Sequence, residues 1–123
     1  MITEDQIVEE SYGNLIIDLY NETRLSAEVI ECAGRRFGAT EWDVEAVGER
    51  ANTALERLDH ASIDEMKQHI ETMLEDLESA RRALVHYQGI QRLAQRTGML
   101  RFMIDGAIKR ITRIVELAHR GRD

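Results

Sequence analysis

The sequence predicts an all-α protein, an antiparallel bundle of about four helices, and three observations support this. Proline is absent from the 123 residues, so no residue removes a backbone donor from a helix interior. Apolar residues recur at steps of three and four through most of the chain, which is the period of a helix face. Helix N-cap patterns occur at three positions. We expect one helical domain over residues 1–123.

The first helix is predicted over residues 3–34. Thr3 and Gln6 have the spacing of a capping box, in which the hydroxyl and the amide each bind a free backbone N–H at the helix start. An apolar stripe follows, made of Val8, Tyr12, Leu15, Ile16, Leu19, Tyr20, Ala27, Ile30 and Ala33. Gly34 and Gly38 favour a helix end there, because glycine readily adopts a left-handed cap.

The second helix is predicted over residues 41–58, with Thr40 as its N-cap and Asp43 as the residue that reaches back. It is much shorter than the first and third helices, so an isolated bundle would leave part of each long helix without a neighbour. We therefore expect a homodimer, in which a second copy covers the overhang. The competing solution is a kink at Gly13 or Gly89 that folds a long helix back on itself.

The third helix is predicted over residues 62–96, with Ser62 and Glu65 as its capping box. Its apolar residues alternate steps of three and four over about 25 residues, as in a coiled coil. The pattern weakens from Gly89, so the helix either bends there or stops at Thr97 and Gly98. The fourth helix, over residues 99–119, has an apolar arc too broad for one neighbouring helix.

The apolar faces of the third and fourth helices are the predicted dimer seam. Its residues are Ile63, Met66, Ile70, Met73, Leu77, Leu84, Ile104, Ile108, Ile111 and Val115.

Charge is sorted along the chain. Residues 1–78 contain 20 of the 23 acidic residues and 6 of the 16 Lys and Arg, a net charge of −14, whereas residues 79–123 have a net charge of +7. The sign changes inside the third helix, so an antiparallel second copy would set acidic residues against basic ones along its length. We interpret the asymmetry as a device that fixes this antiparallel register.

No set of polar residues converges on an active site, so we expect a non-enzymatic protein that acts through its surface. The predicted function is an adaptor, anti-activator or inhibitor that binds an unidentified protein through a charged helical surface. The predicted partner-binding residues are Arg81, Arg82, Arg92, Arg96, Arg101, Lys109, Arg110 and Arg113. The alternative is nucleic-acid binding by the same basic part, extended by Arg120 and Arg122. Few aromatic residues and a net charge of −7 oppose this alternative.

Residues 81–87, Arg-Arg-Ala-Leu-Val-His-Tyr, resemble the short Arg-x4-His signature of the HEPN family of helical ribonucleases. The resemblance covers these seven residues and implies that Arg81 and His86 would handle a scissile phosphate. Within one straight helix the two residues lie about 140° apart, too far around the axis to share a phosphate. Arg82 and His86 instead form a surface row with Glu78.

No cofactor or metal is expected. A di-iron bundle requires two Glu-x-x-His pairs, and the sequence contains one, Glu116 with His119. Cys32 is the single cysteine, so no disulfide can form within the chain, and a cytoplasmic location is the default. The N-terminus is acidic and no stretch approaches the ~20 apolar residues of a membrane span, so we expect no membrane partner.

Overall fold

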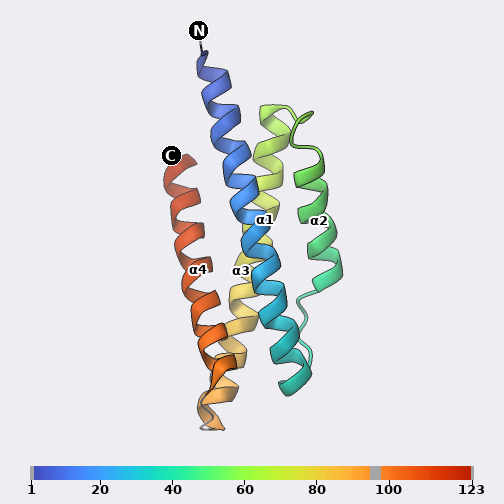
Figure 1. The fold of residues 1–123 in the computed structure, drawn as a ribbon, viewed down its shortest axis with the longest axis vertical. Coiled ribbons are helices and arrows are strands. Elements are labelled where there is room, and N and C mark those ends of the chain that lie inside the picture. Colours follow the sequence, from blue (N-terminus) through green and yellow to red (C-terminus); the bar gives the residue numbers. More distant parts are fainter. Residues whose placement is uncertain (1, 95–97, 123) are drawn as a thin grey trace.

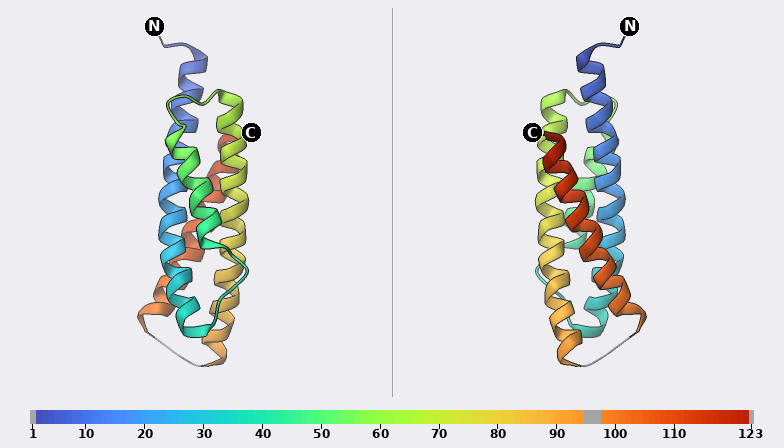
Figure 2. Two further views of the ribbon diagram at one scale, coloured as in Figure 1. Left: turned by 90° about the vertical axis from the view of Figure 1, so that its right-hand side faces the viewer. Right: turned by 90° about the vertical axis from the view of Figure 1, so that its left-hand side faces the viewer.

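The computed structural model describes residues 2–94 and 98–122, and its elements are four α-helices (Figure 1). The helices are α1 (Glu4–Phe37), α2 (Val44–Glu56), α3 (Ile63–Leu93) and α4 (Met99–Arg122). Successive helices run in opposite directions, so α1 and α3 run parallel to each other. Figure 2 shows α2 over one side of the α1–α3 pair and α4 over the other. The all-α class predicted from the sequence is confirmed.

Two helices begin where the capping patterns predict. The Thr3 amide donates to Gln6 Oε1 at 2.9 Å and the Gln6 amide donates to Thr3 Oγ1 at 3.2 Å, which completes the capping box of α1. Ser62 Oγ accepts from the Glu65 amide at 3.1 Å at the start of α3. Each cap therefore satisfies amides that have no partner within the helix.

The start of α2 differs from the prediction. Asp43, not Thr40, is the N-cap, and its Oδ1 accepts from the Ala46 amide at 3.1 Å. Thr40 Oγ1 accepts only from the Trp42 amide, at 3.4 Å. Residues 38–43 run along the bundle before α2 begins, because this path places the Trp42 indole in the core.

The alternative to the homodimer, a kink at Gly13 or Gly89 that folds a long helix back on itself, does not occur, since helical structure continues through both residues. α1 extends past Gly34 to Phe37, and the Gly38 amide closes it by donating to the Gly34 carbonyl at 2.9 Å. α3 ends at Leu93, so its predicted last residues, through Arg96, lie outside the helix or outside the described residues.

The core lies where α1, α3 and α4 meet, and α2 adds Val47, Ala51 and Ala54 to it. Eight of the ten predicted seam residues are buried in this core within the single chain, and Ile63 and Ile108 are half-buried. The eight buried residues are Met66, Ile70, Met73, Leu77, Leu84, Ile104, Ile111 and Val115. These side chains pack against the chain's own helices, so a second copy could not reach them without opening the bundle. This corrects the expectation that the seam faces a second copy.

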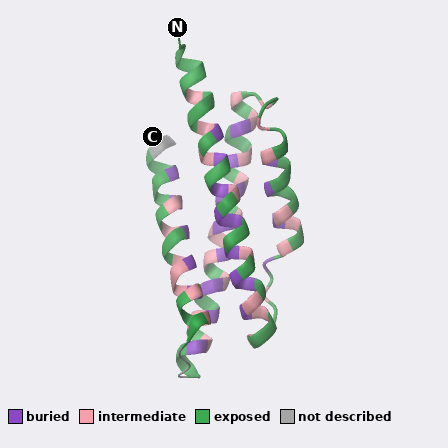
Figure 3. Cartoon of the chain, viewed as in Figure 1, coloured by how far each residue is buried: buried purple, intermediate pink, exposed green. Residues whose placement is uncertain are grey.

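The parts of α1 and α3 that extend beyond the short α2 helix are covered at one end of the bundle only. α2 has 13 residues, against 34 in α1 and 31 in α3. Below α2, the connection with Trp42 covers the α1–α3 pair, and the indole Nε1 donates to the Asp76 carbonyl at 2.9 Å. At the other end, the first turns of α1 project beyond the remaining helices and are exposed (Figures 1 and 3).

Among the described residues, no helix has a stretch long and apolar enough to cross a lipid bilayer.

Candidate interaction surfaces

The predicted partner-binding residues lie in different environments. Arg81 is half-buried between helices, where its Nη1 donates to Thr112 Oγ1 of α4 at 3.3 Å. Arg101 is exposed, and its Nε lies 4.0 Å from Asp105. Arg92 is exposed near the end of α3. Arg96 and the side chain of Arg122 lie outside the described residues. The structure therefore does not gather these residues into one site.

Arg110 of α4 pairs with a residue that the sequence analysis missed. Its Nε lies 3.1 Å from both carboxylate oxygens of Glu22, which is buried in α1. Glu22 also accepts from the Ser26 hydroxyl at 3.0 Å. The available signal was the position of Glu22 three residues after Leu19, on the apolar stripe of the first helix. Arg110 thus links α4 to α1.

The outward side of α4 carries a row of exposed residues at helical spacing. We call it the α4 basic face and define it as Lys109, Arg113, Leu117 and Arg120. These residues are separated by steps of four, four and three, so they lie along one side of the helix. Within the described part of the chain, the three cations have no ion-pair partner. Their charge is therefore directed to solvent.

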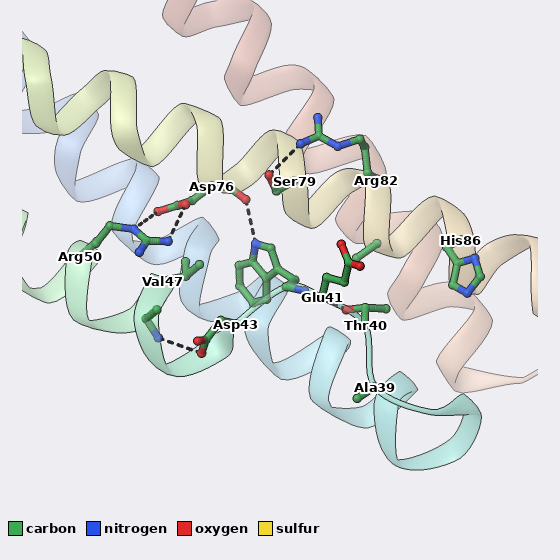
Figure 4. Close-up of a pocket in the computed structure, with 13 residues that line it drawn as sticks. Ala39, Thr40, Glu41, Asp43, Val47, Arg50, Asp76, Ser79, Arg82 and His86 are labelled. Atoms are coloured by element: carbon green, nitrogen blue, oxygen red, sulfur yellow. Dashed lines mark hydrogen bonds and ion pairs between the residues drawn. The ribbon is translucent and has the colours of Figure 1, made fainter.

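A hollow of about 730 Å³ lies between α3 and the connection that carries Trp42 (Figure 4). On its α2 side, Arg50 forms two hydrogen bonds of 2.9 Å with the Asp76 carboxylate. The hydrogen bond to Asp76 raises the pKa of Arg50 above its ordinary value, although burial opposes this effect. Arg82 and His86, which are both exposed, line the hollow on α3.

The hollow has no consistent charge. Glu41 and Asp43 line it together with Arg82 and His86, so it does not select for anions or for cations. Trp42 is buried and belongs to the core, and its indole Nε1 already donates to the Asp76 carbonyl at 2.9 Å. The hollow therefore shows no set of groups that would recognise one class of ligand.

The Arg-x4-His signature is split between two sides of α3. Arg81 bonds Thr112 of α4, whereas His86 lines the hollow beside the Trp42 connection. The expected surface row is also divided, because Arg82 donates to Ser79 at 2.8 Å while Glu78 lies 3.9 Å from His119 of α4. The geometry required of a shared phosphate site is not present in these side chains.

No group of three or more His, Cys, Asp or Glu side chains in the described residues is placed to hold a metal ion. Cys32 is half-buried and accepts from Arg35 Nη2 at 3.2 Å. Comparison with known proteins yields no matching family model, no similar curated protein and no similar solved structure.

Proposed function

We propose that the chain is a non-enzymatic interaction protein that binds an acidic surface of a protein partner through the α4 basic face. The observation that carries this proposal is the row formed by Lys109, Arg113, Leu117 and Arg120. An exposed apolar residue among unpaired cations matches an acidic helix or loop with one apolar anchor. The row lies on a rigid helix, so binding requires little ordering of the backbone.

The same cations would support nucleic-acid binding, which is the second candidate. Three features favour the protein partner instead. Glu116 is exposed on α4 between Arg113 and Arg120, and the chain as a whole has a net charge of −7. Both oppose the dense charge of a phosphate backbone more strongly than a protein surface with a few carboxylates. Leu117 would gain contact with a protein side chain but not with a phosphate backbone.

We further propose that the protein is a homodimer. The predicted seam is buried within the single chain, so a contact between two copies needs other apolar surface. The first turns of α1 offer such surface, because they project beyond the bundle and Ile2 and Ile7 are exposed. Light scattering after gel filtration should give about twice the chain mass of 14.1 kDa over a wide range of concentrations. A mass of one chain throughout would rule out the homodimer.

The partner proposal is tested by charge reversal. Wild-type protein and the variant Lys109→Glu/Arg113→Glu/Arg120→Glu are immobilised and incubated with extract of the native cell, and the captured proteins are quantified by mass spectrometry. We expect an acidic protein that is captured by the wild type and lost with the variant. The matched control is the variant Asp18→Arg/Glu28→Arg, which changes exposed charges on α1 and should retain the capture.

Nucleic acid is tested on the same variants. Duplex and single-stranded probes are titrated at about 50 mM salt, where phosphate contacts are strong. A shift of either probe by the wild type that the α4 variant abolishes would replace the protein partner with nucleic acid. Equal capture of every protein by the wild type and the α4 variant would exclude the α4 basic face.

A further inference from the structure

The most exposed large apolar side chains gather at the two ends of the bundle. Among the described residues, the five highest exposures are 88% for Leu93, 76% for Phe102, 75% for Met99, 69% for Ile2 and 57% for Ile7. Ile2 and Ile7 belong to the start of α1, and the other three flank the connection from α3 to α4. Exposed apolar side chains are unfavourable in water, so we expect another molecule to cover them at both ends of the bundle.

The N-terminal end is acidic. We define the acidic end as residues 2–10, the first turns of α1 and the residues before them, which project beyond the other helices (Figure 1). Ile2 and Ile7 occupy the two positions of a hydrophobic staple, so they lie on the same side of the helix start. The exposed acids around them are Glu4, Asp5, Glu9 and Glu10.

The opposite end is basic. We define the basic end as Arg92, Leu93, Met99, Arg101 and Phe102, all of them exposed. The 4.0 Å contact of Arg101 with Asp105 offsets its charge only in part, and Arg92 has no ion-pair partner among the described residues. The last turn of α1, with exposed Arg35 and Arg36, reaches the same end of the bundle.

We propose that two copies associate side by side and antiparallel, with the acidic end of each copy on the basic end of the other. This inference rests on the proposed homodimer and names the surfaces that form it. Two acidic ends would repel each other, and so would two basic ends, whereas unlike ends attract and can bury their apolar residues together. An antiparallel pair makes both unlike contacts at once and is closed by a twofold axis.

Charge reversal at one end tests this arrangement. The variant Glu9→Arg/Glu10→Arg cancels the negative charge of the acidic end, because its two arginines offset Glu4 and Asp5, and the variant Arg92→Glu/Arg101→Glu makes the basic end acidic. We expect each variant alone to dimerise on the order of tenfold more weakly than the wild type, and a mixture of the two to form a heterodimer that binds more tightly than either variant binds itself, because it regains one of the two unlike contacts. Sedimentation velocity with one variant fluorescently labelled measures all three associations, and circular dichroism checks that each variant is folded.

Two control variants make the same changes of charge away from the ends. Asp18→Arg/Glu28→Arg matches the first variant and Lys109→Glu/Arg113→Glu matches the second, and all four positions are exposed. Both controls should dimerise like the wild type. If they weaken the dimer as much as the end variants do, total charge rather than the ends controls association, and the arrangement is overturned.

The remaining outcomes separate this inference from the proposed homodimer. If the wild type and both end variants are all dimers of equal strength, the homodimer stands and the end contacts are wrong. If the wild type is a monomer at every concentration, the homodimer itself fails. If mixing does not strengthen association, the pairing of unlike ends is excluded. A wild-type mass that grows beyond two chains would mean head-to-tail stacking, in which each end contacts a different copy.

Discussion

The Nε of Arg110 on α4 lies 3.1 Å from both carboxylate oxygens of Glu22 on α1. Glu22 is only 7% exposed, and among the described residues its other hydrogen bond comes from the Ser26 hydroxyl. A buried carboxylate is stable only when its charge is paired, because removal from water penalises the ionised form. The contact joins the acidic first helix to the basic last helix, so part of the charge sorting is neutralised within the chain.

Arg110→Ala should lower the free energy of unfolding by about 1–3 kcal/mol, because it leaves the Glu22 carboxylate without its cation. Urea denaturation followed by circular dichroism at one protein concentration measures this loss. The control is Arg113→Ala, which removes an exposed and unpaired arginine one turn away and should change stability by no more than about 0.5 kcal/mol.

A Glu22→Gln background separates the ion pair from the packing of the arginine. With the carboxylate removed, Arg110→Ala should cost clearly less than it does in the wild type, and the difference is the coupling between the two residues. Equal losses in the two backgrounds would show that the ion pair does not stabilise the bundle.

Tyr87→Phe should destabilise the fold by about 0.5–1.5 kcal/mol, because it removes a hydrogen bond between the buried Tyr87 side chain and the end of α1. The Tyr87 hydroxyl donates to the Gly38 carbonyl at 2.7 Å and thereby ties the end of α1 to α3. Tyr12→Phe is the control, since the Tyr12 hydroxyl has no hydrogen bond among the described residues. Thermal unfolding of both variants checks the prediction, and similar shifts in Tm would contradict it.

The parts of the fold that the sequence predicts correctly depend on neighbouring residues. The Thr3 and Gln6 pair and the Ser62 and Glu65 pair act over three residues, so their spacing alone is enough to locate two helix starts. Thr40 has the same local pattern and fails, because Asp43 is an equally good cap and the burial of Trp42 decides between them. Competition between two local signals is settled by distant contacts.

The parts that could not be predicted depend on which surfaces meet. Apolar residues at alternating steps of three and four are expected whether a helix packs against its own chain or against a second copy. The spacing in α3 therefore could not identify the surface against which this helix packs. The position of Glu22 on the apolar stripe indicates burial, but no local pattern identifies its cation, because Arg110 is 88 residues away. The bond from Trp42 to the Asp76 carbonyl spans 34 residues and leaves no local pattern.

Trp42→Ala should cost about 3–5 kcal/mol of stability, because the indole closes the core below the short α2 helix and no other large side chain of the connection replaces it. Trp42→Phe should cost less, about 1–2 kcal/mol, since it retains a ring but loses the hydrogen bond to Asp76. Urea denaturation of the two variants gives both values. A loss below about 1 kcal/mol for Trp42→Ala would mean that this side chain does not close the core.

Gly38→Ala and Gly89→Ala should change stability in opposite directions. An added Cβ meets no atom within 4 Å at either position, so crowding does not distinguish the two variants. Gly38 has φ +100 and ψ 152, a backbone conformation that only glycine adopts readily, and alanine there should cost about 1–3 kcal/mol.

Gly89 lies inside the continuous α3 helix, where alanine should stabilise by about 0.5–1 kcal/mol because it loses less backbone freedom on folding. Thermal unfolding of the two variants beside the wild type measures both effects. A lower Tm for Gly89→Ala would indicate that α3 needs glycine at this position, and it would restore the bend near Gly89 that the sequence allowed.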